Sequence, residues 1–222
     1  MKNTNKALKY IFIRHGKLDL PYKNHSEMPI SVLTEIASGK INPSIDFDFI
    51  NERLLKLEPY LRNIDKIVVS SSQRCVETGK TINEFLKQKA KNKINFFIES
   101  DITEVSFDVG KIISDLDYTP NLKQLNILVF EAISGINEGA ETSQSVFNRV
   151  KKVLKKYQAD DQVILIVTHS FLLETLEMYI NNKHVENFNG SFKELLKSSK
   201  VGYLNGFTTD ADLNIIDLIK IQ

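Results

Sequence analysis

Short apolar runs alternate with longer stretches of helical period along this chain of 222 residues. The runs are rich in β-branched and aromatic residues and are too short for helices, so they predict strands. They cover residues 8–13, 67–69, 94–98, 163–167, 201–208 and 213–221. The run at 163–167 is apolar at every position, which is typical of a strand buried on both faces of a parallel sheet.

Apolar residues spaced three and four apart predict helices between these strands. The stripes are Ile50, Leu54, Leu57 and Leu61; Cys75, Gly79, Ile82 and Leu86; Val146, Phe147, Val150, Val153, Leu154 and Tyr157; and Leu172, Leu173, Leu176, Tyr179 and Ile180. Pro59 should end or kink the first of these helices early, because proline lacks the N–H that a helix interior needs. Ser191 and Glu194 form a candidate capping box for one more helix.

The alternation of strands and helices predicts an α/β fold. We expect one domain over residues 1–222, with a mostly parallel central sheet, helices on both faces and a closing hairpin around 209–212. Two segments, about 17–45 and 99–140, show no clear period. Long irregular excursions in a compact domain are often lids or pocket walls, so we expect these segments to form a cap.

Composition narrows the classes of function. The formal net charge is +1, from 29 basic and 28 acidic residues, whereas nucleic-acid-binding domains are usually strongly basic. No apolar run approaches the ~20 residues that a membrane span needs, and no signal-peptide pattern follows the polar start of the chain. The single cysteine, Cys75, cannot form an internal disulfide. We therefore expect a cytoplasmic protein without a nucleic-acid or membrane partner, and its oligomeric state stays open.

Side chains suited to anion binding follow several of the predicted strands. Arg14 and His15 come after the first strand, Arg74 after the second and His169 after the fourth. Ligands of open α/β sheets bind beyond the carboxyl ends of the strands, so we expect these side chains to share one crevice. A guanidinium matches two oxygens of a phosphate at once.

Besides the arginines and histidines, we expect two further residues to contribute to this anion site. Lys17 follows the first strand closely and can line the crevice, and Ser170 precedes a helix whose N-terminal amides favour an anion. Both residues are therefore candidate substrate-binding residues.

Two histidines beside two arginines indicate phosphoryl transfer with a covalent step. A neutral imidazole is a good nucleophile, and its unperturbed pKa of ~6.5 keeps it neutral at neutral pH. Arginines can neutralise the phosphoryl oxygens without a metal ion. The sequence shows no carboxylate cluster of the Mg²⁺ type and no glycine-rich P-loop. We therefore expect neither a metal nor a cofactor.

The motifs at these strand ends resemble those of the histidine phosphatase superfamily, branch 1, the group that contains the phosphoglycerate mutases. Five blocks carry the resemblance, in family order: Arg14-His15-Gly16, Ser70–Thr78, Ile102–Phe107, Gly139–Thr142 and Val163–Ser170. They extend over roughly residues 8 to 181, most of the chain. The resemblance implies the phosphoglycerate mutase-like α/β fold.

The resemblance also implies a role for each motif residue. His15 would attack phosphorus and carry a phosphohistidine, while Arg14, Arg74 and His169 would hold the phosphoryl oxygens. Glu104 would protonate the leaving oxygen and then help a water molecule attack the intermediate. For that first step Glu104 must be protonated, which requires a raised pKa.

The sequence leaves open which carboxyl group is the proton donor. The family has a glycine about four residues after the acid, and Asp108 stands there in this chain. The local turn can therefore differ, and Asp101 or Asp108 could replace Glu104 as the donor.

Departures from the mutase pattern favour hydrolysis over mutase activity. Leu18 stands where the family commonly has a threonine or serine. Pro21 and Phe107 stand where mutases have an asparagine and a tyrosine, and the paired arginines of mutases are missing between Arg74 and Arg149. We therefore expect a metal-independent phosphatase acting on a small-molecule phosphate ester or a phosphoprotein. The alternatives are a phosphoglycerate mutase-like phosphoryl transferase and a non-catalytic relative that binds a phosphorylated ligand.

Overall fold

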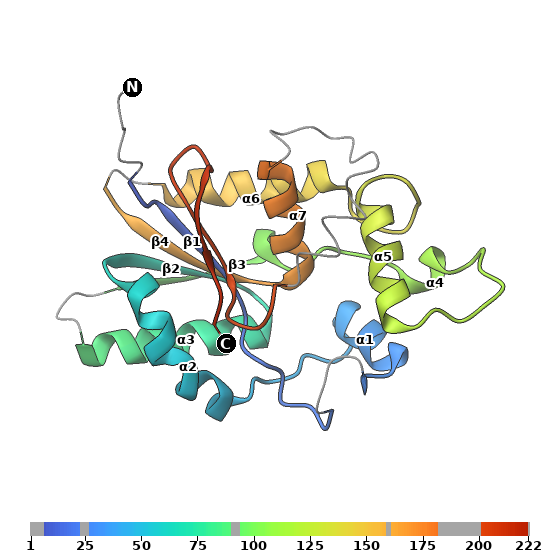
Figure 1. Cartoon of the computed structure of the whole chain (residues 1–222), viewed down its shortest axis with the longest axis horizontal. Coiled ribbons are helices and arrows are strands. Elements are labelled where there is room, and N and C mark those ends of the chain that lie inside the picture. The colour runs from blue at the N-terminus through green and yellow to red at the C-terminus, as the bar shows by residue number, and fades with distance from the viewer. Residues whose placement is uncertain (1–6, 23–26, 90–93, 159–160, 182–200, 222) are drawn as a thin grey trace.

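A six-stranded sheet forms the centre of the protein, in the order β3-β2-β4-β1-β5-β6 (Figure 1). The structure is a computed structural model, which describes residues 7–22, 27–89, 94–158, 161–181 and 201–221. The strands are β1 (Tyr10–Arg14), β2 (Ile64–Ser70), β3 (Asn95–Glu99), β4 (Val163–Thr168), β5 (Gly206–Thr209) and β6 (Ile215–Ile219). Strands β1 to β4 are parallel, whereas β5 and β6 form an antiparallel hairpin beside β1. This arrangement confirms the predicted fold, a single α/β domain.

Helices connect the parallel strands. They are α1 (Ile30–Ala37), α2 (Phe47–Leu61), α3 (Gln73–Lys89), α4 (Val109–Ile112), α5 (Leu122–Ile133), α6 (Ser143–Tyr157) and α7 (Ser170–Asn181), with a short 3-10 helix, η2 (Ser100–Ile102). The four apolar stripes of the sequence lie on α2, α3, α6 and α7, and nearly all their members are buried. Their burial confirms that the stripes are the core-facing sides of helices.

Helices cover both faces of the sheet because the strand residues alternate between two cores. Tyr10 and Phe12 of β1 pack in one hydrophobic cluster with residues of α5, α6 and α7. Ile11 and Ile13 pack in the other cluster with residues of α2 and α3. Figure 1 shows α6 and α7 on one side of the sheet and α2 and α3 on the other. The two-sided covering was predicted from the strand–helix alternation and is confirmed.

Pro59 does not end α2 early, so that part of the expectation was wrong. The helix contains Pro59 and continues to Leu61. Only the bond to the carbonyl of Leu55 is lost, because Pro59 has no N–H. Leu55 is 66% exposed, so water can bind that carbonyl oxygen, and the helix tolerates the proline in its last turn.

The two segments without a clear period contain regular helices. Helix α1 lies in the first segment, and α4 and α5 lie in the second. Helix α5 begins with a capping box between Asn121 and Gln124, which the sequence analysis missed. Leu33, Val109 and Leu125 of these helices belong to the same cluster as α6 and α7, so the segments are packed parts of the domain. The predicted capping box at Ser191 and Glu194 lies outside the described residues.

In the part of the chain that the structure describes, no helix has both the length and the apolar character needed to cross a membrane.

Candidate active site

The carboxyl ends of β1 and β4 bring the two motif histidines together. Arg14 and Thr168 are partners in the parallel pairing of these strands, so His15 and His169, which follow them, leave the sheet side by side. The His15 backbone N–H donates to the Thr168 carbonyl oxygen at 2.9 Å. The two imidazole rings are 5.4 Å apart between centroids, and both residues are buried. The structure thus brings the two histidines together, as the sequence analysis expected of side chains at neighbouring strand ends.

The backbone next to His15 fixes which ring nitrogen carries a proton. Its Nδ1 lies 2.7 Å from the carbonyl oxygen of Gly16. A carbonyl oxygen only accepts hydrogen bonds, so Nδ1 carries a proton, and in the neutral form of the ring the lone pair lies on Nε2. The contact therefore selects Nε2 as the atom that can attack phosphorus.

The turn that holds His15 depends on glycine. The Gly16 N–H donates to the Thr78 hydroxyl at 2.9 Å, and that hydroxyl donates to the Arg74 carbonyl at 2.6 Å. A Cβ atom on Gly16 would lie only 2.2 Å from Cδ1 of Ile50 on α2. A side chain at this position would therefore require Ile50 of α2 to move, and the threonine ties the turn to α3.

His169 is neutral and has a defined tautomer. Its Nδ1 lies 3.1 Å from Nη2 of Arg74, and its Nε2 lies 2.8 Å from the Ser70 hydroxyl. A guanidinium only donates, so Nδ1 accepts and Nε2 carries the proton. Burial lowers the pKa of His169 well below its ordinary value, and the charge of Arg74 lowers it further. The ring therefore stays uncharged at neutral pH.

Two buried or half-buried guanidinium groups supply the positive charge of the site. Arg74, in the first turn of α3, is 7% exposed. Arg14, at the end of β1, donates from Nη1 to the Val201 carbonyl at 2.9 Å. The buried Nε of Arg14 has no hydrogen-bond partner among the described residues. This arrangement suits an anionic ligand, because burial strengthens the attraction of a guanidinium for an anion.

Glu104 lies at the start of α7, close to both arginines. Its Oε1 accepts hydrogen bonds from the backbone N–H groups of Val105 and Leu172, each at 3.0 Å, and its Oε2 has a longer contact of 3.4 Å to the N–H of Phe171. Removal of the carboxylate from water raises its pKa, although these backbone bonds and the charge of Arg74 oppose the rise. Oε2 has fewer donors facing it, so it is the oxygen better placed to carry a proton.

The two alternative donors have other partners. Asp101 forms an ion pair with Lys152 at 2.9 Å. Asp108 caps α4 by accepting from the Lys111 N–H at 3.1 Å. The charges of Arg74 and Arg14 both act on the Glu104 carboxylate, where they oppose the rise of its pKa.

Lys17 and Ser170, the other two predicted site residues, occupy different positions. The Lys17 ammonium pairs with Asp46 of the α2 N-terminus at 3.2 Å. Ser170 is the first residue of α7, directly after His169. The structure thus places Ser170 next to the histidine pair, whereas the described partner of Lys17 is a carboxylate at the start of α2.

Tyr203 belongs to the site although the sequence analysis did not identify it as a site residue. Its ring lies 4.2 Å from Cζ of Arg14 and 5.8 Å from the ring of His15, measured to centroids. Phe49 of α2 contacts the same ring at 6.0 Å. No motif marks Tyr203, because it approaches His15 only through the pairing of β5 with β1.

The one cysteine also lies beside His169 but does not suit nucleophilic chemistry. Cys75 Sγ is 3.5 Å from His169 Nε2, and burial raises the pKa of its thiol to about 12. A thiolate is the reactive form of cysteine, so at neutral pH the described site favours an imidazole nucleophile over a thiol.

Comparisons with known proteins agree with this geometry. A family model described as the histidine phosphatase superfamily (branch 1) matches residues 52–209, most of the chain, although His15 lies before the matched range. A search of curated proteins finds no match.

Several solved structures are similar over nearly the whole chain. Phosphoserine phosphatase from Entamoeba histolytica, solved with 3-phosphoglyceric acid, has a TM-score of 0.59 at 14% identity, covering 96% of this chain and 97% of that chain. YhfR from Bacillus stearothermophilus has a TM-score of 0.55 at 14% identity, covering 96% and 95%. The mycobacterial glucosyl-3-phosphoglycerate phosphatase has a TM-score of 0.56 at 14% identity, covering 89% and 87%. At such identities the likeness shows a shared fold.

Proposed function

Because this chain belongs to branch 1 of the histidine phosphatase superfamily, we propose that it hydrolyses a phosphate monoester through a phosphohistidine on His15. The observation that carries the proposal is the contact of His15 Nδ1 with the Gly16 carbonyl. It leaves the lone pair on Nε2, beside a neutral histidine and two guanidinium groups. No step of the proposed reaction requires a metal ion or a cofactor.

In the first step, Nε2 of His15 forms a bond to phosphorus while the bond from phosphorus to the leaving oxygen breaks. Arg14, Arg74 and His169 surround the oxygens of the transferred group. Catalysis of phosphoryl transfer depends mainly on positioning and on stabilising charge. Buried arginines provide both, and the neutral ring of His169 holds Arg74 through Nδ1.

Glu104 supplies and later removes the protons. In the first step its carboxyl group donates a proton to the leaving oxygen, and its raised pKa supports that role. In the second step the carboxylate accepts a proton from water, the water oxygen bonds to phosphorus, and the bond from phosphorus to His15 breaks. Phosphate leaves, and both Glu104 and His15 return to their starting forms.

A small phosphate ester is the substrate class that we favour. The similar structures include enzymes named for phosphoserine and for glucosyl-3-phosphoglycerate, which are small esters, and a phosphoprotein is the second possibility. Residues 17–45 and 99–140 would supply specificity as a cap over the site. We also propose a cytoplasmic location for this enzyme.

The experiment that tests this proposal is hydrolysis of 4-nitrophenyl phosphate and of a panel of phosphorylated metabolites by the wild-type protein and by His15→Ala. We expect activity in the wild-type protein, unchanged by EDTA, and its loss by at least about 10³-fold in the variant, because no nucleophile remains. Circular dichroism checks that the variant is folded.

Trapping the intermediate provides the complementary evidence. Rapid quenching of the wild-type reaction into alkali should leave phosphate on His15, since phosphohistidine survives alkali and is lost in acid. Turnover by His15→Ala at the wild-type rate, or strong inhibition by EDTA, would contradict the proposal. Transfer between phosphoglycerates without net hydrolysis would instead identify a mutase.

A further inference from the structure

We propose that Arg149 of α6 is a positioning residue for the general acid: its guanidinium holds the segment 101–104, so that the Glu104 carboxyl group meets the leaving oxygen. This inference rests on the proposed function and deepens it. Arg149 makes no described hydrogen bond to the histidines or the arginines of the site, although its charge contributes to the lowered pKa of His169, and a lysine at this position would keep that charge. Its effect would pass through the backbone that carries Glu104.

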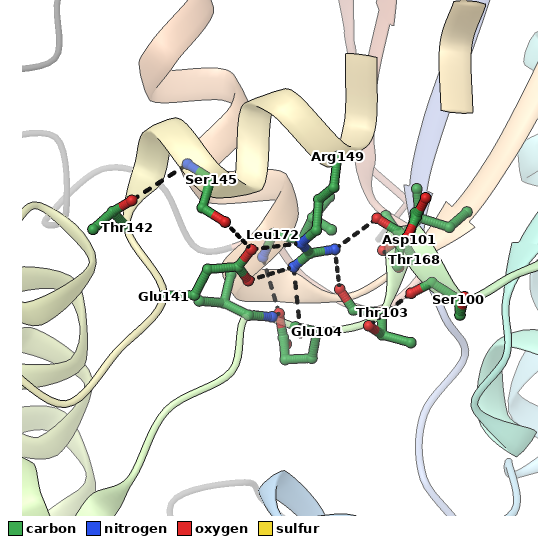
Figure 2. A network of polar contacts seen from close by, with 12 residues as sticks. Ser100, Asp101, Thr103, Glu104, Glu141, Thr142, Ser145, Arg149, Thr168 and Leu172 are labelled. Carbon is green, nitrogen blue, oxygen red and sulfur yellow. Dashed lines mark hydrogen bonds and ion pairs between the residues drawn. The ribbon is translucent and has the colours of Figure 1, made fainter. Parts of the chain in front are cut away.

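The Arg149 guanidinium uses all of its hydrogen-bond donors (Figure 2). Nε and Nη2 donate to the two carboxylate oxygens of Glu141, both at 2.9 Å. Nη1 donates to the carbonyl oxygens of Asp101 at 2.8 Å and Thr103 at 2.9 Å, and Nη2 has a contact of 3.4 Å to that of Glu104. An arginine has five N–H donors in a fixed plane, and here they meet three backbone carbonyl oxygens and one carboxylate.

Asp101 lies in η2, and Thr103 and Glu104 lie in the irregular segment between η2 and the isolated β-bridge at Phe107. This segment has no strand or helix beyond η2 to satisfy its carbonyl oxygens, and unpaired buried carbonyl groups are costly. The guanidinium therefore replaces a regular hydrogen-bond ladder. It defines the path of the backbone directly before Glu104.

Glu141 fixes the guanidinium in turn. The Ser145 hydroxyl donates to Glu141 Oε1 at 2.8 Å, and the Glu141 N–H donates to the Ser106 carbonyl at 2.8 Å. Burial alone would raise the pKa of Glu141, but the bonds from Arg149 and Ser145 lower it below the ordinary value. The carboxylate thus stays ionised at neutral pH. The Glu141–Arg149 pair contacts both ends of the segment from Asp101 to Ser106, which carries Glu104.

Two further contacts define where the Glu104 side chain ends. The Thr168 hydroxyl donates to the Ile102 carbonyl at 2.7 Å, which ties the segment to the end of β4 beside His169. The carboxyl group itself is bound by the N–H of Leu172 at the start of α7. With both its backbone and its carboxyl group held, Glu104 has little freedom. A displacement of about 1 Å can cost roughly 10²-fold in rate.

Leaving-group dependence separates a positioning role from a general structural one. An alkyl ester needs a proton on its leaving oxygen, whereas 4-nitrophenolate is a stable anion and leaves without one. A misplaced Glu104 should therefore slow β-glycerophosphate far more than 4-nitrophenyl phosphate. A generally damaged site, in which His15 or Arg74 has moved, should slow both substrates alike.

The test variant is Arg149→Lys, which keeps the charge but offers a single ammonium that cannot replace the planar set of contacts. We expect kcat/KM for β-glycerophosphate to fall about 10- to 100-fold and kcat/KM for 4-nitrophenyl phosphate to change less than about threefold. The matched control is Lys152→Met. Lys152 pairs with the Asp101 side chain of the same segment and is 77% exposed, so we expect both rates to stay within about twofold.

Double variants identify the route of the effect. In a Glu104→Gln protein, adding Arg149→Lys should lower kcat/KM for β-glycerophosphate less than about twofold further, because the proton donor is already absent. Glu141→Gln provides a second, milder variant that removes one charge from the pair. It should show the same preference for 4-nitrophenyl phosphate if Arg149→Lys folds poorly.

The possible outcomes distinguish the two proposals. Equal slowing of both esters by Arg149→Lys and by Glu141→Gln, or no slowing of β-glycerophosphate by either variant, would overturn the role of Arg149 alone. Full additivity with Glu104→Gln would do the same. A wild-type protein without activity on either ester, or with activity that survives His15→Ala, would overturn the proposed function and with it this inference.

Discussion

Tyr203 shows how a single side chain can complete the site without belonging to any motif. Its ring covers the Arg14 guanidinium at 4.2 Å and lies against the His15 ring. An aromatic face attracts a guanidinium by about 0.5–2 kcal/mol, more when water is excluded. Tyr203 therefore helps to hold Arg14 in the orientation that a phosphoryl group would meet.

At the residue scale, this contact predicts the effect of two Tyr203 variants. Tyr203→Phe keeps the ring and should lower kcat/KM for 4-nitrophenyl phosphate by less than about threefold. Tyr203→Ala removes the ring and should lower it by about 3- to 30-fold, the rate equivalent of the lost contact. Steady-state kinetics measures both. If the alanine variant retained wild-type kcat/KM, Tyr203 would have no part in holding Arg14.

At the scale of a single element, α7 carries a buried carboxyl group that the proposed reaction does not use. Glu174 lies one turn after Ser170 and is 8% exposed. Its Oε1 accepts a hydrogen bond from the Val201 N–H at 3.1 Å, while the Val201 carbonyl accepts from Arg14. The backbone N–H and carbonyl of Val201 therefore connect α7 to the arginine at the end of β1.

Burial raises the pKa of Glu174 to about 8. The folded protein therefore holds this proton more tightly than the unfolded chain, and between about pH 4.5 and 8 it binds more protons there than the unfolded chain does. Stability must then fall as pH rises through this window. Since one pKa unit corresponds to about 1.4 kcal/mol, the full loss from Glu174 is at most about 5 kcal/mol.

Glu174→Gln should remove this part of the pH dependence. Urea unfolding at pH 5 and at pH 8.5 measures the change in the free energy of unfolding for each protein. We expect a smaller loss of stability at pH 8.5 in the variant than in the wild-type protein, because the amide does not ionise. Glu84→Gln, at an exposed ion pair on α3, should leave the wild-type loss unchanged. Identical pH dependence in the Glu174 variant and the wild-type protein would contradict burial of an ionisable carboxyl group.

At the scale of the whole molecule, the hairpin of β5 and β6 closes one edge of the sheet and depends on a glycine. A Cβ atom on Gly206 would lie 1.8 Å from the carbonyl oxygen of Phe12 in β1. Backbone cannot move aside as a flexible side chain can. The side-chain-free residue therefore allows β5 to pair with β1 and to bring Tyr203 to the site.

Gly206→Ala should accordingly destabilise the protein. Overpacking costs about 1–3 kcal/mol or more, and each kcal/mol lowers Tm by about 2–4 °C for a chain of this size. We expect a decrease in Tm of about 3–10 °C in a thermal melt. Gly110→Ala in α4 is the control, because its Cβ would meet only a side-chain oxygen, at 3.3 Å, and its Tm should change little. An unaltered Tm in Gly206→Ala would show that β1 and β5 are not packed this closely.

The periodic parts of the fold could be predicted from the sequence, and the irregular parts could not. The predicted stripe from Val146 to Tyr157 forms the buried side of α6. In a helix, residues three and four positions apart lie on one side, so an apolar stripe with this spacing identifies the side that packs against the core. Helix α5 was missed, although Asn121 and Gln124 cap it. Its cap signal is short, and in the sequence its apolar residues do not stand out from their irregular surroundings.

The sequence by itself determined the α/β fold, its family and the placing of Arg14, His15, Arg74 and His169 at strand ends, because strand and helix periods are local and parallel strands end at a common edge. Only the tertiary structure decided the surroundings of those groups. Arg14 meets Val201 across 187 positions of the chain, and Arg149 meets Asp101 across 48. Such contacts leave no pattern in the neighbouring sequence, since each arises from strand pairing and helix packing between distant segments.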